Sequence, residues 1–282
     1  MSSIRAPALR YSGENGRTNG RRNGGGGPSR PNRSTPKVVI LAGGRGTRLA
    51  PYTSILPKPL MPIGDRAILE IVVDQLVRQG FSDIALSVGH LSHLIRAVFD
   101  QRTRTDATIT FVQEEKALGT AGPLRLIKKL DQTFLAMNGD VLTTLDYRAL
   151  VRHHHESGNL LTIATHERKV KIDYGVLHLD DIDSRSGRVL AYDEKPEIAS
   201  LVSMGVYVIE PQALVHIPDY EYFDIPDLVQ SLLAAGAPVG AFTYDGMWFD
   251  IGRKDDYELA AEAWEHNENG KSPVRNEEAA LV

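Results

Sequence analysis

The sequence predicts an α/β protein with a mixed, mostly parallel central sheet between two layers of helices, and with a smaller antiparallel part. In the first half of the foldable chain, short apolar strands alternate with amphipathic helices, as in parallel sheets covered on both faces. From residue 160 the strands follow one another closely, which is typical of antiparallel sheets. Both observations come from the spacing of apolar residues along the chain.

Strands are expected where short apolar runs end in glycine or polar residues. The first run, 37–42, is Lys-Val-Val-Ile-Leu-Ala and predicts a strand buried in the sheet. The other predicted strands are 83–88, 107–112, 133–137, 160–166, 174–179, 187–192 and 201–209.

Helices are expected where apolar residues recur at helical spacing. The first begins near Asp65, which can act as its N-cap, and ends at Gly80. Asp224 and Gly236 bound a later helix over 225–235 in the same way. The remaining predicted helices are 91–102, 121–130 and 254–265.

The composition limits the class of protein. At 282 residues, 42% hydrophobic and 24% charged, the chain suits one large α/β domain or two small ones, and a single domain over 36–265 is simpler. It has no cysteine, which excludes disulfides and thiolate metal sites and is compatible with a cytoplasmic protein. It has no long apolar run or signal core, so we expect a soluble protein without a membrane segment.

Both ends of the chain differ in composition from the middle. Residues 1–36 carry seven arginines against one glutamate, a net charge of +6, and residues 1–35 are expected to be a disordered basic Gly/Arg-rich tail. Such a tail can bind nucleic acid, but we favour a solvated extension and predict no nucleic-acid partner. Residues 266–282 are predicted to be a polar C-terminal tail.

A glycine-rich loop follows the first strand, where α/β sheets bind ligands. Gly43, Gly44 and Gly46 lack a Cβ and can turn their amides towards phosphate groups. Cationic side chains and four prolines follow; the cations are Arg45, Arg48 and Lys58, and the prolines, at 51, 57, 59 and 62, restrict the segment around Lys58. The spacing fits neither a P-loop nor the dinucleotide fingerprint.

The whole string is more specific than its glycines. Gly-Gly-x-Gly-Thr-Arg-Leu, then Pro-x-Thr, then Pro-Lys-Pro-Leu-x-Pro closely resembles the signature of the sugar-1-phosphate nucleotidyltransferases, also called nucleotide-sugar pyrophosphorylases. The resemblance covers about residues 37–262. With the predicted strand order it implies a Rossmann-like three-layer sandwich, whose antiparallel part covers the substrate, and in-line attack of a sugar 1-phosphate on the α-phosphate of a nucleoside triphosphate, which releases pyrophosphate.

The resemblance also implies where the nucleotide binds. Leu118-Gly-Thr-Ala-Gly-Pro-Leu124 resembles the family segment that closes over base and ribose, and we expect it to present amides at a helix N-terminus. An ordinary helix-starting turn is the alternative. The predicted nucleotide-binding residues are Leu41, Ala42, Gly43, Gly44, Gly46, Thr47, Arg48, Lys58, Glu114, Gly119 and Thr120.

Two aspartates are candidate ligands of Mg²⁺, the cofactor that the resemblance implies. Asp140 ends the strand 133–137 in Asn-Gly-Asp, which delivers it to the ligand-binding edge of the sheet. Asp250 lies in Trp-Phe-Asp-Ile-Gly-Arg, which matches the family's second metal-binding segment. Without the resemblance, each can be read as an aspartate in a turn.

A third group matches the family's sugar-phosphate site. Glu194-Lys195-Pro196 would by itself indicate a solvated turn, but the resemblance implies that Glu194 binds sugar hydroxyls and Lys195 the sugar phosphate. The predicted sugar-phosphate-binding residues are Asn138, Tyr174, Gly175, Glu194, Lys195 and Gly205. The predicted catalytic residues are Arg48, Lys58, Asp140 and Lys195.

Glu114 bears on the choice of base. Family members that use uracil or thymine tend to carry glutamine five residues before the glycine that Gly119 matches, whereas an ionised Glu114 only accepts hydrogen bonds and suits the two adjacent donors of guanine. We therefore favour GTP, with mannose 1-phosphate or a manno-heptose 1-phosphate as partner. Glu114 as a solvated loop residue is the alternative.

Other functions stay open. They are uridylyl, thymidylyl or cytidylyl transfer to another sugar 1-phosphate, or a non-catalytic regulator that binds nucleotide sugars. The run His153-His154-His155 is predicted to lie on a helix surface, because consecutive helical residues cannot face one metal ion. The amino-acid sequence does not indicate the oligomeric state, so a homo-oligomer also stays open.

Overall fold

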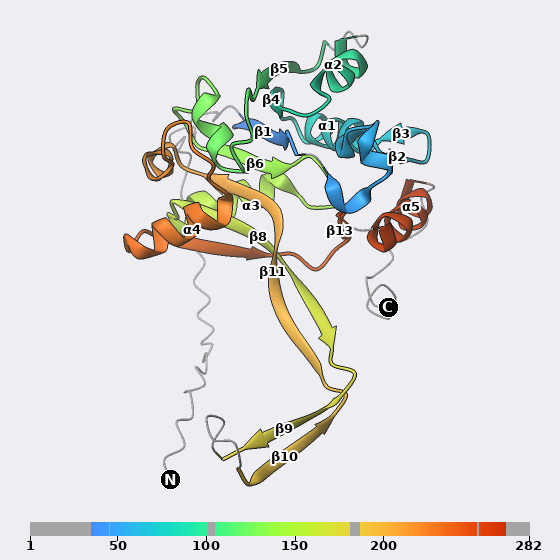
Figure 1. Ribbon diagram of the computed structural model, residues 1–282. Coiled ribbons are helices and arrows are strands. Elements are labelled where there is room, and N and C mark those ends of the chain that lie inside the picture. Colours follow the sequence, from blue (N-terminus) through green and yellow to red (C-terminus); the bar gives the residue numbers. More distant parts are fainter. Residues whose placement is uncertain (1–34, 45, 101–104, 181–186, 253, 269–282) are drawn as a thin grey trace, which may run out of the picture. The chain divides into compact units, whose positions relative to one another are not determined.

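Seven strands form the central sheet of the computed structural model, in the order β12-β8-β11-β6-β1-β4-β5 (Figure 1). β11 runs antiparallel to both β6 and β8, while β12 is parallel to β8 and the pairs among β6, β1, β4 and β5 are parallel. The predicted mixed, mostly parallel sheet is therefore confirmed. The strands are β1 (Lys37–Ala42), β4 (Asp83–Val88), β5 (Thr108–Gln113), β6 (Phe134–Asn138), β8 (Leu161–Lys171), β11 (Glu197–Ile209) and β12 (Val239–Thr243).

The structure describes residues 35–44, 46–100, 105–180, 187–252 and 254–268. The predicted N-terminal tail, except Thr35, and the C-terminal tail beyond Glu268 lie outside the described residues, as does Arg45. Within the described residues, no helix has both the length and the apolar character needed to cross a membrane.

Each face of the sheet has its own apolar core, because side chains of a strand alternate between faces. In β1, Val38 and Ile40 pack into one core and Val39 into the other. The first core is closed by α1 (Ile68–Arg78), α2 (Ser92–Asp100), α3 (Tyr147–Ser157) and α5 (Lys254–Glu268). The second is closed by α4 (Ile225–Ala234) and the 3₁₀ helices η4 (Gly122–Leu126) and η5 (Pro211–His216). The result is the expected three-layer sandwich.

Short elements outside the main sheet shape its carboxyl edge. Three 3₁₀ helices follow the glycine-rich loop: η1 (Thr47–Leu49), η2 (Tyr52–Ser54) and η3 (Lys58–Leu60). The small antiparallel sheets pair β2 (Pro62–Ile63) with β3 (Arg66–Ala67), β7 (Val141–Thr143) with β13 (Trp248–Asp250), and β9 (Gly175–Leu179) with β10 (Val189–Glu194).

Two helix predictions were wrong in detail. α1 begins at Ile68 and not near Asp65, since Glu70 accepts a hydrogen bond from the amide of Ala67 at 3.1 Å and closes the first turn there. The helix expected over 121–130 is only the 3₁₀ helix η4, because the backbone of Ile127 is extended, with φ of −85° and ψ of 125°, and ends it.

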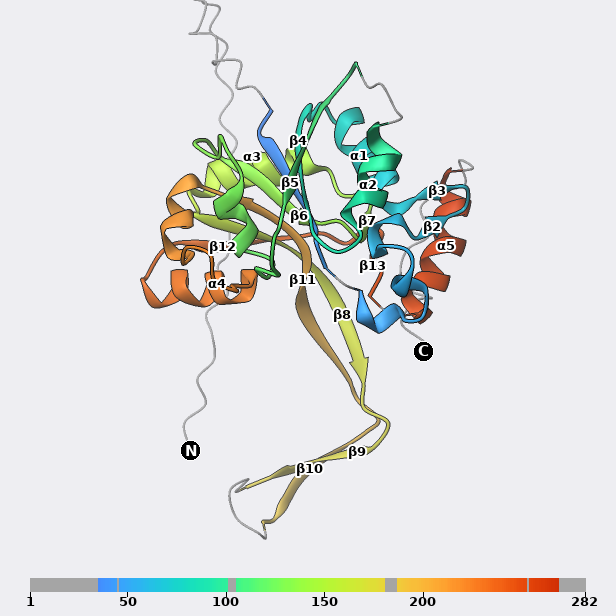
Figure 2. The same ribbon diagram turned by 45° about the horizontal axis from the view of Figure 1, so that its top comes forward.

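β8 and β11 are both longer than predicted and continue beyond the sheet as a two-stranded ribbon that ends in the β9–β10 hairpin. Figure 1 and Figure 2 both show this ribbon leaving the body of the fold. We call its described residues, 167–180 and 187–201, the arm. The antiparallel part of the fold thus extends outward from the sheet, whereas the sequence predicted a part that covers the substrate.

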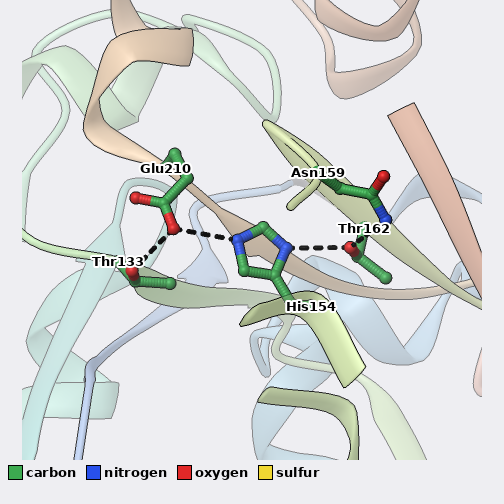
Figure 3. Close-up of polar contacts among 5 residues, drawn as sticks. All are labelled: Thr133, His154, Asn159, Thr162 and Glu210. Atoms are coloured by element: carbon green, nitrogen blue, oxygen red, sulfur yellow. Dashed lines mark hydrogen bonds and ion pairs between the residues drawn. The ribbon is translucent and has the colours of Figure 1, made fainter. Parts of the chain in front are cut away.

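The surface prediction for the histidine run was wrong for its middle member. His154 is 1% exposed, because α3 turns it towards the sheet. Its Nδ1 lies 2.8 Å from the Thr162 hydroxyl and its Nε2 lies 3.1 Å from Glu210, which also accepts from Thr133 (Figure 3). Asn159 donates to Thr162. A neutral imidazole with the proton on Nε2 can donate to Glu210 and accept from Thr162, so each residue of this row of hydrogen bonds has a partner.

His154→Ala is expected to lower the free energy of unfolding by about 2–4 kcal/mol, because it leaves a cavity and unpaired buried oxygens. Burial lowers the pKa of His154 more than Glu210 raises it. The unfolded chain therefore binds more protons, and stability falls as pH drops below the unfolded pKa of about 6.5. Denaturant melts measure the free energy of unfolding at pH 7.5 and 5.5. We expect it to fall less between these two pH values in His154→Ala than in the wild type. His153→Ala is the control. If both substitutions lower the free energy of unfolding equally, the role of His154 is contradicted.

Candidate active site

The carboxyl ends of four parallel strands meet at one edge of the sheet. β1 lies between β6 and β4, and the chain passes from β1 to β4 and β5 before it returns to β6 on the other side. The winding direction reverses here, which is where open α/β sheets bind ligands. The glycine-rich loop after β1 thus lies between Asp140, after β6, and Glu114, after β5.

The glycine-rich loop is shaped by the segment that follows it. Gly46 has φ of 63°, and a Cβ there would lie 2.9 Å from Thr53 Cγ2 and 3.1 Å from Lys58 Cβ. The Thr53 hydroxyl donates to the carbonyl of Gly46 at 2.8 Å. The loop therefore turns sharply because residue 46 is glycine, and the same turn places the stem of Lys58 beside it.

β7 and β13 bring the two predicted metal ligands together. Asp140 directly precedes β7, and Asp250 ends β13 opposite Val141. The amide of Ile251 donates to the carbonyl of Asp140 at 3.2 Å. The Lys58 ammonium makes an ion pair with Asp140 Oδ2 and lies 3.9 Å from Asp250 Oδ1. The structure thus brings Lys58, Asp140 and Asp250 together, with one cation beside both carboxylates.

Burial and the neighbouring charges set the protonation of this pair. Burial raises the pKa of Asp250 and the Asp140 carboxylate raises it further, while Lys58 and Arg48 act in the opposite direction. Arg48 comes from η1 on the glycine-rich loop, and its Nη1 lies 3.6 Å from where a Cβ of Gly252 would be. Two cations from the loop segment therefore lie near Asp250, which ends β13, and one of them, Lys58, also pairs with Asp140 just before β7.

The pair has the chemistry that a hard divalent cation needs. Asp140 Oδ1 is buried and has no hydrogen-bond partner among the described residues, so this oxygen is left for a ligand that the chain does not supply. The described residues contain no group of three or more candidate ligands. Asp140 and Asp250 would thus supply two oxygens of a Mg²⁺ shell and leave the others to phosphate and water.

Glu114 lies over the glycine-rich loop. Its carboxylate accepts from the Ser87 hydroxyl at 2.9 Å and from the amide of Leu118 at 3.4 Å. A Cβ at Gly43 would collide with it. Burial raises the pKa of Glu114, and the two hydrogen bonds oppose that rise. Glu114 is thus a half-buried carboxylate fixed by two hydrogen bonds, and not a solvated loop residue.

The segment around Gly119 is fixed to the start of α4. Asp224 accepts from the amide of Thr120 at 2.8 Å and from its hydroxyl at 3.0 Å, and the same hydroxyl accepts from Ile225. Gly119 has φ of 79°, and a Cβ there would lie 2.5 Å from the carbonyl of Phe223. The segment was expected to present its amides at a helix N-terminus, but Asp224 accepts from the amide of Thr120, and the carbonyl of Phe223 accepts from those of Ala121 and Gly122. These three amides are therefore not left for a ligand.

Two of the predicted sugar-phosphate residues lie beside the carboxylates. Asn138 ends β6, and its Nδ2 lies 2.7 Å from where a Cβ of Gly205 would be. Gly205 has φ of 73° and lies in the bulge of β11, where the indole of Trp248 donates to the carbonyl of Met204 at 3.0 Å. The bulge therefore presents backbone, and no side chain, next to Asn138.

The other four lie on the arm, which leaves the sheet at the carboxyl edge, because β8 runs parallel to β6, and extends away from the body of the fold (Figure 2). Tyr174 is 79% exposed. Tyr192 covers Gly175, and its hydroxyl donates to Glu194 at 2.6 Å. Lys195 has φ of 47° at the corner where the hairpin begins. Within this chain, the arm residues and the carboxylate pair are not brought together.

Three residues that position the site were missed from the sequence. Ser87 holds Glu114, Thr53 holds the glycine-rich loop, and Asp224 holds Thr120. Thr53 was part of the Pro-x-Thr motif, so a signal was present. Asp224 had been assigned only to the helix start, and nothing local to Ser87 distinguishes it from other strand residues.

This sheet, its glycine-rich loop and its cation–carboxylate cluster form a candidate ligand site in a Rossmann-like fold. The chain belongs to the Nucleotidyl transferase family, whose sequence model matches residues 37–267.

The relatives are sugar-1-phosphate nucleotidyltransferases. A UTP–glucose-1-phosphate uridylyltransferase of Synechocystis is 34% identical over 241 residues, 78% of this chain and 61% of that protein. Mannose-1-phosphate guanyltransferase beta-B of Xenopus laevis is 31% identical over 228 residues, 78% of this chain and 62% of that protein. The chain thus spans about three fifths of the length of these curated relatives. Crystalline HddC from Yersinia pseudotuberculosis, complexed with GMP-PN, superposes with a TM-score of 0.62 at 26% identity and covers 82% of this chain and 100% of its own.

Proposed function

We propose that this protein is a Mg²⁺-dependent enzyme of the cytoplasm that makes a nucleotide sugar and pyrophosphate from a nucleoside triphosphate and a sugar 1-phosphate. An oxygen of the sugar phosphate attacks the α-phosphorus, the bond from the α-phosphorus to the bridging oxygen breaks, and pyrophosphate leaves. Alignment and charge neutralisation carry such a transfer, so no covalent protein intermediate is needed.

The observation that carries the proposal is the cluster of Lys58, Asp140 and Asp250 beside the glycine-rich loop. A Mg²⁺ ion held by the two aspartates would neutralise charge on the reacting phosphates. Arg48, from the same loop segment, lowers the pKa of Asp250 and so adds a second positive charge near the pair. A triphosphate on the loop would thus meet cations along its length.

For the nucleotide we propose GTP, on the position of Glu114. Its carboxylate lies over Gly43, and Gly43 belongs to the loop that would hold the phosphates. Guanine offers N1–H and the 2-amino group as adjacent donors to a carboxylate, whereas uracil would turn a carbonyl towards it. A manno-configured sugar 1-phosphate is proposed as the partner. Similarity to the uridylyltransferase favours UTP with glucose 1-phosphate as the second candidate.

The test is a matrix of five nucleoside triphosphates against mannose, glucose and manno-heptose 1-phosphates, with pyrophosphate release as the readout. We expect turnover to need Mg²⁺ and to be highest with GTP. Preference for UTP contradicts the base assignment alone. Nucleotide-sugar binding without turnover in any pair would instead indicate a regulator.

Glu114→Gln is expected to lower the GTP to UTP ratio of kcat/KM by about tenfold or more, because an amide pairs with a pyrimidine edge as well as with guanine. Glu115→Gln, the exposed neighbour, is the matched control and should leave the ratio unchanged. An unaltered ratio in both variants means that Glu114 holds Leu118 and does not read the base.

A further inference from the structure

The arm has an apolar surface that nothing in the described chain covers. Every residue from Glu167 to Lys171 of β8 and from Glu197 to Leu201 of β11 is exposed. Most of the large exposed apolar side chains of the described residues lie on the arm, among them Val170, Tyr174, Leu177, Tyr192, Ile198 and Leu201. These side chains are divided between the two faces of the ribbon, because Ile198 pairs with Val170 while Leu201, three residues further on, pairs with Glu167. An isolated two-stranded ribbon is marginally stable, and exposed apolar side chains on a ribbon of this kind mark an interaction surface.

One apolar face of the hairpin carries a residue expected to bind the sugar phosphate. Leu177 pairs with Tyr192, and Gly175 pairs with Glu194 two residues further along the hairpin. Because side chains two residues apart share a face, Glu194 lies on the apolar face with Leu177 and Tyr192. Whatever covers this face therefore meets Glu194.

The arm cannot bring these residues to its own site by bending at the hairpin. Gly175 and Glu194 are the hairpin's first pair, beside the corner formed by Lys195 and Pro196. Folding about that corner leaves them at the far end of the ribbon. From Thr165 to Lys171 the ribbon extends by about six residues, or roughly 20 Å.

The base of the arm is also held in place. Arg168 donates to Asp256 of α5 at 3.2 Å and lies over the ring of Trp248. Trp248 in turn bonds to Met204, in the bulge where β11 could otherwise bend. Swinging the arm onto its own body would break these contacts, so the arm is directed outward.

We propose that the arm of one copy of this chain docks on the body of a second copy, so that Glu194 and Lys195 of the first complete the sugar-phosphate site beside the carboxylate pair of the second. The placement of that site rests on the proposed function; the docking does not. Exchange of identical arms about a two-fold axis completes both sites. Burial of Tyr174 and Tyr192 alone would cover roughly 300 Å², a large part of the about 800 Å² that each partner gives to a stable interface.

The test is complementation between two variants that are each inactive. One carries Asp140→Asn in the body, and the other carries Glu194→Ala with Lys195→Ala in the arm. Co-expressed with different tags and purified without selection for either, the pair should recover roughly a quarter of wild-type turnover, since about half of the dimers are mixed and each has one intact site. No recovery, with an active wild type, overturns the proposal; so does an arm variant as active as the wild type.

Light scattering tests the docking without any measurement of enzymatic activity. The wild type should have the mass of a dimer, and Leu177→Glu should shift it to the monomer. Leu233→Glu is the control, because Leu233 is 53% exposed against 54% for Leu177 but lies on α4. A wild-type monomer, or two variants that behave alike, overturns arm exchange. If no substrate pair releases pyrophosphate, the proposed function fails, and the mass measurement still decides whether the arms exchange.

Discussion

Asp140→Asn is expected to lower kcat by at least about a hundredfold, because an ion that neutralises phosphate charge contributes several kcal/mol to such a transfer. The substitution keeps the shape of the side chain and removes its charge. It leaves Lys58 without its closest carboxylate and makes the buried Oδ1 position a poorer ligand for a cation. The measurement is steady-state pyrophosphate release over a range of Mg²⁺ concentrations.

Asp219→Asn is the matched control for that experiment. Asp219 also pairs with a cation, Arg125, but its side chain is 67% exposed and lies on the loop before α4. Its loss should leave kcat within about threefold of the wild type. If Asp140→Asn behaves as this control does, the carboxylate pair is not the site of the chemistry.

Lys58→Met is expected to reduce kcat by about 10²–10³-fold and to destabilise the metal-free protein by about 2–4 kcal/mol. The ammonium lies between two carboxylates, so its removal leaves like charges facing one another in a partly buried place. Addition of Mg²⁺ should restore more stability to the variant than to the wild type, because a cation at the pair replaces part of the lost charge.

The stability deficit of Lys58→Met should narrow as pH falls. The pKa of Asp250 is already raised by burial and by Asp140, and loss of Lys58 removes one of the charges that oppose the rise. A carboxyl whose folded pKa lies above its unfolded value binds more protons in the folded state, so lowering the pH relieves its cost. Thermal melts at pH 7.5 and 5.5 measure the change.

Lys37→Met is the matched control for Lys58→Met. The Lys37 side chain is 13% exposed against 12% for Lys58, and it pairs with Asp83 at 2.9 Å at the amino end of the sheet. Its loss should leave kcat unchanged and should give no Mg²⁺ dependence of stability. Equal effects in the two variants would mean that Lys58 acts only through general stability.

Prediction from sequence succeeded where a structure depends on neighbouring residues. The strands expected at 37–42 and 83–88 are β1 and β4 with the same bounds, since a short apolar run buried on both faces is bounded by polar residues or glycine. It failed where pairing is distant. β7 and β13 were missed, because segments of only three residues become strands by hydrogen bonding to each other from distant parts of the chain. β2, β3 and β12 were missed as well.

The sequence by itself determined most of the longer strands and helices, the glycine-rich loop with its cations, and the delivery of Asp140 to the carboxyl edge, because each follows from local backbone geometry and the direction of one strand. Tertiary structure alone decided that Asp250 comes beside Asp140, that Glu114 covers Gly43, and that His154 is buried. It also decided that Glu194 and Lys195 lie on an outward arm. These positions depend on register and packing between segments far apart in the chain, and no local pattern of residues encodes them.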